Sequence, residues 1–165
     1  MEMGLEHKRV LVTGSTKGIG RAIAEAFAKE GADVVINGRR AETVQAVVTE
    51  LATAYPETQP IAAPFDISRP AEADQLFEQV PTVDVLVNNM GIFGPMAYDT
   101  IDDETWERFF KVNVLSGNRL ARHYLPAMLA NDFGRIIFIA SEEAVMPSGE
   151  MPQYSMTCLL YTSPS

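Results

Sequence analysis

Residues 13–20 read Thr-Gly-Ser-Thr-Lys-Gly-Ile-Gly and separate two different patterns of apolar residues. Before them, Lys8–Thr13 is a short β-branched run of the kind that forms a buried strand. After them, apolar residues recur four positions apart at Ile19, Ile23 and Phe27, which indicates a helix with one packed face. Glycines at such a turn permit a tight bend, a close approach of the backbone to a pyrophosphate, and close packing of helix on strand. Free N–H groups at the helix start then favour binding of the anion.

Glycines also mark ordinary turns, so a glycine-rich stretch alone is a weak signal. Here a strand precedes the glycines and a helix follows them, as a phosphate-binding motif requires. We therefore predict that residues 13–20 form a phosphate-binding loop.

The rest of the chain alternates short apolar runs with helical segments. Further strands are predicted at Asp33–Asn37, Ile61–Phe65, Asp84–Asn88 and Arg135–Ala140, and further helices at 41–54, 70–79 and 102–130. Pro126 predicts a kink or break near the end of the last helix. This alternation indicates an α/β fold, a three-layer doubly wound parallel sheet with helices on both faces, formed as one domain by residues 1–157.

Composition and charge exclude several classes of partner. The 165 residues carry a formal net charge of -9, which disfavours nucleic acid and anionic lipid surfaces. No apolar run approaches the roughly 18 residues of a membrane helix, and the charged start of the chain does not resemble a signal peptide. Cys158 is the single cysteine, so no intrachain disulfide is possible. His7 and His123 lack acids or thiols at metal-ligand spacing. We expect a cytoplasmic protein without a metal site.

The motif T-G-x-x-x-G-x-G, the run Asn88-Asn89-Met90-Gly91, and Ser141 followed thirteen residues later by Tyr154 occur in a fixed order. Together, from Arg9 to about Thr157, they resemble the short-chain dehydrogenase/reductase family. The resemblance implies a Rossmann-like fold, a nicotinamide dinucleotide, and hydride transfer to or from a small carbonyl or alcohol substrate. The cofactor-binding residues that it implies are Gly14, Ser15, Thr16, Lys17, Gly18, Ile19, Gly20, Arg39, Asp66, Ile67, Asn88, Gly91 and Tyr154. Met90 replaces the family's alanine, a departure that alters packing beneath the cofactor.

The end of the second predicted strand bears on the choice of cofactor. NAD-selective proteins place an acid there to bind the ribose 2′-hydroxyl, whereas this chain reads Asn37-Gly38-Arg39-Arg40. Arg39 can pair with a 2′-phosphate, and Lys17 adds a second cation, so NADP(H) is preferred and NAD(H) is possible. The alternative is that both arginines are solvated loop residues. Asp66, with Ile67 beside it, matches the acid that contacts the adenine in the family, or else caps a turn.

The resemblance also implies a catalytic set of Asn113, Ser141 and Tyr154, in which the serine holds the substrate oxygen and the tyrosine transfers its proton. A free phenol has a pKa near 10 and is a poor base at neutral pH. The family places a lysine four residues after the tyrosine to lower this pKa, but here that position is Cys158. A neutral thiol supplies neither the cation nor its N–H donors. We therefore expect little activity. The alternative for Asn113 is an asparagine that is solvated or satisfied within the core.

The end of the chain departs from the family pattern. Residues 158–165 read Cys-Leu-Leu-Tyr-Thr-Ser-Pro-Ser and do not continue an amphipathic helix. Our hypothesis is that the chain is a fragment with a tail that is not the native continuation, so the sheet is incomplete at its C-terminal end. The full-length form would be a homodimer or homotetramer. The competing hypothesis is a short non-catalytic dinucleotide-binding or regulatory module. Glu142 and Glu143 are expected in a solvated loop, with a place beside the substrate as the alternative.

Overall fold

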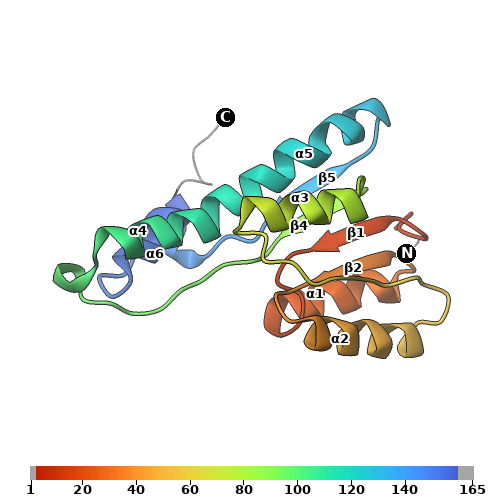
Figure 1. Ribbon diagram of the computed structural model, residues 1–165, viewed down its shortest axis with the longest axis horizontal. Coiled ribbons are helices and arrows are strands. Elements are labelled where there is room, and N and C mark those ends of the chain that lie inside the picture. The colour runs from red at the N-terminus through yellow and green to blue at the C-terminus, as the bar shows by residue number, and fades with distance from the viewer. Residues whose placement is uncertain (1–2, 160–165) are drawn as a thin grey trace.

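A computed structural model describes residues 3–159 and shows a parallel sheet between two layers of helices (Figure 1). The strands lie in the order β3-β2-β1-β4-β5, and every pair is parallel. The strands are β1 (Arg9–Val12), β2 (Asp33–Asn37), β3 (Ile61–Ala63), β4 (Val85–Asn88) and β5 (Arg135–Phe138). The helices are α1 (Gly18–Lys29), α2 (Ala41–Ala54), α3 (Pro70–Gln79), α4 (Asp103–Phe110), α5 (Ser116–Ala130) and α6 (Pro152–Leu159), with short 3₁₀ turns η1 (Tyr98–Thr100) and η3 (Glu142–Ala144). The predicted doubly wound α/β fold is confirmed.

The core lies on both faces of the sheet because successive strand residues point to opposite sides. Val10 and Val12 of β1 pack with the residues of α1 and α2, whereas Leu11 between them packs with those of α3 and α5. Figure 1 shows the same arrangement, with α1 and α2 on one side of the strands and α3 and α5 on the other. Burial on both faces explains why the central strands are continuous apolar runs without alternation.

Strand β5 differs from the other strands in its exposure. It pairs with β4, and among the described residues no strand covers its other edge. Ile137 of β5 is 40% exposed, whereas the residues of β4 are buried. The fifth strand is therefore an open edge in residues 3–159, as expected for a sheet that is incomplete on this side.

The long helical region from 102 to 130 is divided where the sequence predicted one helix. A π-helical turn, η2 (Lys111–Leu115), separates α4 from α5. The expected break at Pro126 is not found, because α5 continues to Ala130. Tyr124 and Met128 lie on either side of Pro126 and are buried in the core, which holds this last turn in place.

The third strand ends earlier than predicted, at Ala63 instead of Phe65. The next residue, Pro64, has no N–H to donate to the ladder, and the carbonyls of Ala63 and Phe65 accept hydrogen bonds from the side chain of Asn37. Cys158 and Leu159 continue α6, and residues 160–165 of the expected foreign tail lie outside the described residues. Within residues 3–159, no helix is both long and apolar enough to cross a membrane.

Candidate active site

The glycine-rich turn between β1 and α1 is shaped for the close approach of a ligand. Gly14 and Gly18 have φ values of +62° and +57°, in the region that favours glycine. A Cβ at Gly20 would lie 2.5 Å from the carbonyl oxygen of Gly14, so α1 packs too tightly on the turn for any side chain there. A Cβ at Gly18 would meet nothing within 4 Å, so space is open above the helix start. No side chain caps this end of α1, where Lys17 is extended and exposed, and Ile19 is also exposed. The residues form a cradle whose free N–H groups suit an anion.

Asn37, at the end of β2, joins this turn to the end of β3. Its N–H donates to Ser15 Oγ at 3.0 Å, and its carbonyl accepts from Ser15 N–H at 2.9 Å. Its side-chain amide donates to the carbonyls of Ala63 and Phe65, both at 3.0 Å. The sequence analysis gave Asn37 no role. A polar residue at the last position of a buried strand was the signal that could have identified it.

The chain after Asn37 lies against the glycine-rich turn. A Cβ at Gly38 would lie 2.7 Å from Thr16 Cγ2, so the backbone at Gly38 passes close to the Thr16 side chain. Arg39 follows directly and is exposed. Lys17 and Arg39 therefore extend from two adjoining loops at the carboxyl ends of β1 and β2. Neither side chain forms an ion pair with an acid within residues 3–159.

Asn89, after β4, fixes the turn from the other side. Its side-chain amide donates to the carbonyls of Thr13 at 2.9 Å and Gly14 at 3.3 Å. The backbone N–H groups of Asn89 and Met90 both donate to Thr13 Oγ1 at 2.9 Å. The resemblance implied a cofactor contact at Asn88 and Gly91, and Asn89, from the same motif, ties the loop after β4 to the glycine-rich turn.

Asn88 faces a different part of the molecule. Its buried side-chain amide has no hydrogen-bond partner among the described residues. It lines a cavity of about 30 Å³ together with Asn113, Ser116 and Phe138. A Cβ at Gly117 of α5 would lie 3.3 Å from Asn88 Cγ, so the side chain is directed toward α5.

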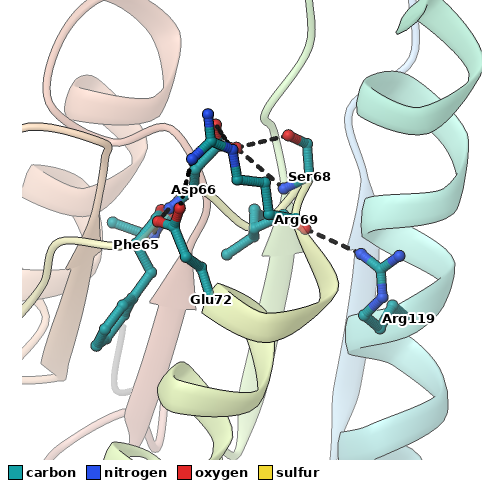
Figure 2. A network of polar contacts seen from close by, with 8 residues as sticks. Phe65, Asp66, Ser68, Arg69, Glu72 and Arg119 are labelled. Atoms are coloured by element: carbon teal, nitrogen blue, oxygen red, sulfur yellow. Dashed lines mark hydrogen bonds and ion pairs between the residues drawn. The ribbon is translucent and has the colours of Figure 1, made fainter.

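Asp66 follows β3 and organises the start of α3 (Figure 2). Its Oδ1 accepts hydrogen bonds from Ser68 N–H at 3.1 Å and from Ser68 Oγ at 2.6 Å. Its Oδ2 lies 3.7 Å from Arg69 Nε, and its own N–H donates to Glu72 Oε2 at 2.6 Å. The carboxylate thus makes the turn-capping contacts that the sequence analysis gave as the alternative to an adenine contact.

Ile67, the next residue, is buried among the apolar residues beneath α3 and α5. Its carbonyl accepts a hydrogen bond from Arg119 Nη1 of α5 at 3.0 Å (Figure 2). The side chain of Ile67 therefore anchors this loop, whereas the neighbouring Asp66 is partly exposed.

Asn113 lies in the π-helical turn and binds two other segments. Its Oδ1 accepts from Ile92 N–H at 2.8 Å, and its Nδ2 donates to the Ile92 carbonyl at 2.9 Å and to Thr157 Oγ1 at 3.0 Å. A Cβ at Gly91 would lie 3.5 Å from Asn113 Oδ1. Asn113 therefore joins the loop after β4 to α6, and π-helical turns of this kind frequently occur at functional sites.

Ser141 and Tyr154 are brought together by β5 and α6. Burial raises the pKa of the Tyr154 phenol above its usual value of 10, and hydrogen bonding with Ser141 opposes that rise. The Cys158 thiol and the Glu143 carboxylate raise the pKa of Tyr154 further. The ring of Phe93 lies 6.0 Å from that of Tyr154. The structure thus groups the two hydroxyls, but it surrounds the phenol with groups that keep it protonated.

Cys158 occupies the place one helical turn after Tyr154. Burial raises the pKa of its thiol, so the side chain is neutral at neutral pH. Lys111, the nearest lysine in the sequence, forms an ion pair with Glu107 at 2.8 Å on the exposed surface. Among residues 3–159, the side chains that shift the pKa of Tyr154 are Ser141, Cys158 and Glu143, and none of them carries a positive charge.

The expectation that Glu142 and Glu143 lie in a solvated loop is wrong for Glu143. Glu142 is exposed, but Glu143 is only 6% exposed and its carboxylate accepts hydrogen bonds from Ser148 and Ser155. A buried carboxylate persists only when it is hydrogen-bonded, and these contacts meet that requirement.

Comparison with known proteins gives a consistent result. The sequence profile of the short chain dehydrogenase family matches residues 8–157. The uncharacterized oxidoreductase YvaG of Bacillus subtilis is 52% identical over 157 residues, which cover 95% of this chain and 60% of YvaG. D-beta-hydroxybutyrate dehydrogenase of Cupriavidus necator is 34% identical over 154 residues, covering 91% of this chain and 59% of that protein. The crystal structure of L-sorbose reductase from Gluconobacter frateurii, complexed with NADPH and L-sorbose, superimposes with a TM-score of 0.91 at 33% identity.

That superposition covers 97% of this chain and 62% of the reductase, so the chain spans about 60% of the length of the relatives that it matches. The match extends over both the glycine-rich turn and the segment that carries Ser141 and Tyr154. From its sequence and its fold alike, the chain belongs to the short-chain dehydrogenase family.

Proposed function

We propose that this chain binds NADP(H) at the carboxyl ends of β1, β2 and β4, and that its Ser141–Tyr154 pair belongs to a carbonyl or alcohol oxidoreductase site. One observation carries the proposal: no side chain caps the start of α1. The turn before this helix is packed closely at Gly14 and Gly20. A phosphate bound there would satisfy N–H groups that no side chain satisfies.

The residues present fit a nicotinamide dinucleotide. The diphosphate would lie over Gly18, where a Cβ meets no other atom within 4 Å. Arg39 and Lys17 would hold a 2′-phosphate, and an arginine can bind a phosphate through two parallel hydrogen bonds. The complex of L-sorbose reductase with NADPH supports this choice. When bound, the cofactor supplies or accepts the hydride.

The chain's own residues would bind the substrate oxygen and transfer a proton to it. The Ser141 hydroxyl would donate a hydrogen bond to the carbonyl oxygen, and the Tyr154 phenol would give its proton to that oxygen during reduction. In the reverse direction the phenol must first lose its proton. Burial and the neighbouring Cys158 and Glu143 all raise the pKa of Tyr154, so this step is disfavoured.

Cys158 supports a second candidate function, a dinucleotide-binding module with little catalysis. A neutral thiol beside Tyr154 provides no cation to stabilise the phenolate. Both candidates predict cofactor binding and differ in hydride transfer. Cys158→Lys therefore separates them.

The choice of cofactor is tested by Arg39→Asp. We expect the NADPH-to-NADH affinity ratio, measured by fluorescence titration, to fall about 10- to 100-fold, because a hydrogen bond to a charged group is worth about 1.5–3 kcal/mol. Arg122→Asp makes the same charge change at an exposed position of α5, on the opposite face of the sheet from α1, and should leave the ratio unchanged. An equal ratio in the Arg39 variant and the original chain would show that Arg39 has no part in the choice.

We also propose that the intact enzyme assembles as a dimer or tetramer through α4 and α5. Phe109 is buried in this chain, but Phe110, Leu125 and Leu129 are exposed on the same helical region. Exposed apolar side chains along one helical region favour a protein–protein contact.

A further inference from the structure

Glu143 connects the turn that carries Ser141 to the helix that carries Tyr154. It lies in η3, two residues after Ser141, and its N–H donates to Ser141 Oγ at 3.3 Å. Its Oε2 accepts a short hydrogen bond from Ser155 Oγ, and Ser155 is adjacent to Tyr154 in α6. The same oxygen accepts from Ser148 N–H at 2.9 Å. Glu143 thus links the turn after β5, through its backbone N–H, to Ser148 and to α6, through its buried carboxylate.

Helix α6 depends on contacts with the rest of the domain. Its described part, Pro152–Leu159, has eight residues, and an isolated segment of this length does not form a stable helix in water. Buried polar side chains on either side of Tyr154 attach α6 to the rest of the domain. Gln153 Nε2 donates to the Gly94 carbonyl at 2.8 Å, and Thr157 Oγ1 accepts from Asn113 Nδ2 at 3.0 Å. The bond from Ser155 to Glu143 differs from these two because its acceptor is charged, and charge-assisted hydrogen bonds are about twice as strong as neutral ones.

We propose that Glu143 is a positioning residue: its buried carboxylate locks the Ser141 turn to α6 and thereby sets the Ser141 hydroxyl against the Tyr154 phenol. The consequence for catalysis rests on the function proposed above. Glu143 does not itself reach the substrate oxygen in this role. It acts through Ser141, whose Oγ its own N–H orients, and through Ser155, which fixes the rotation of α6.

The electrostatic setting agrees with this arrangement. The carboxylate raises the pKa of both Tyr154 and Cys158, because a negative charge nearby disfavours ionisation of the phenol and the thiol. Ser141 has the opposite effect, because its hydrogen bond stabilises the phenolate. The pKa of Tyr154 should therefore rise when the Ser141 hydroxyl no longer contacts the phenol.

The test is a double-mutant cycle on the 165-residue chain, read from the Tyr154 titration by absorbance near 295 nm and assigned with Tyr154→Phe. Ser141→Ala should raise the Tyr154 midpoint, because a hydrogen bond to the phenolate is lost. Ser155→Ala breaks the lock while it keeps the Glu143 charge. We expect Ser141→Ala to cause little further shift in the Ser155→Ala background, because the hydroxyl is no longer held against the phenol.

Amide hydrogen exchange provides the second measurement. In Glu143→Ala, exchange at Ser148 and across α6 should accelerate about 10- to 100-fold, the effect of losing a hydrogen bond to a charged group. Glu142→Ala, at the exposed neighbouring glutamate, is the matched control and should leave exchange unchanged. Glu143→Gln, which keeps the shape and an acceptor, should restore part of the protection, and it serves as the second variant if Glu143→Ala does not fold.

Either of two results would overturn the proposal. One is a Ser141→Ala shift that is absent, or equally large with and without Ser155; the other is unchanged exchange at Ser148 in the Glu143 variants. Neither measurement needs cofactor or turnover. A chain that fails to bind NADPH would refute the proposed function and still leave the role of Glu143 to be decided by these readouts.

Discussion

Cys158→Lys is expected to increase hydride transfer about 10²- to 10⁴-fold, the usual contribution of general acid–base assistance. The suitable protein is a chimera that joins residues 1–157 to the C-terminal part of YvaG, a relative 52% identical to this chain over 157 residues. Its two forms carry lysine or cysteine at position 158. A cation one helical turn from Tyr154 stabilises the phenolate, whereas the thiol raises the pKa of Tyr154.

The measurement is the loss of NADPH absorbance with a panel of small carbonyl substrates. Tyr154→Phe in the lysine form is the control and should return the rate to that of the cysteine form or below it. Equal rates in the lysine and cysteine forms, with both chimeras folded, would contradict the role given to position 158. No turnover in the lysine form with any substrate would favour the non-catalytic module.

Gly20→Ala has the second largest expected effect, because the position has no room for a methyl group. The added Cβ would lie 2.5 Å from the Gly14 carbonyl oxygen and would also collide with the Asn89 side-chain amide. Relief of this overlap requires the glycine-rich turn to move away from α1. We expect the free energy of unfolding in urea to fall by about 1–3 kcal/mol, the usual cost of overpacking, and NADPH binding to fall with it.

The matched control for this change is Gly94→Ala. A Cβ at Gly94 would meet nothing within 4 Å, and its φ is not in the left-handed region. Its unfolding free energy should stay within about 0.5 kcal/mol of the original value, as is usual for surface substitutions. A Gly20→Ala variant that binds NADPH with unchanged affinity would show that the close packing of this turn is not required for binding.

Most of the fold could be predicted from the sequence because it depends on local patterns. The β-branched run before Gly14 and the four-residue spacing after it already define β1 and α1. The errors occur where a distant contact decides the result. Strand β3 ends at Ala63, where Pro64 cannot donate to the ladder and the Asn37 side chain binds the carbonyls of Ala63 and Phe65, and α5 continues past Pro126 because Met128 is buried in the core.

The candidate site could be predicted only in part, for the same physical reason. The motif identified Ser141 and Tyr154, but their approach depends on how α6 packs against the turn after β5. The burial of Glu143 depends on Ser155, twelve residues away, and no pattern in the local sequence distinguishes Glu143 from the exposed Glu142. The contacts of Asn113 with Ile92 and Thr157 likewise join segments 21 and 44 residues apart.

Amide hydrogen exchange of the 165-residue chain, with and without NADPH, tests most directly whether the glycine-rich turn binds a nicotinamide dinucleotide. NADPH should slow exchange in residues 14–20, where the N–H groups at the start of α1 would donate to phosphate, and around 38–40, beside Arg39. Exchange in residues 122–130 of α5 should stay unchanged. Saturating NADPH that leaves residues 14–20 unprotected, or that protects only a different part of the chain, would contradict the proposed site.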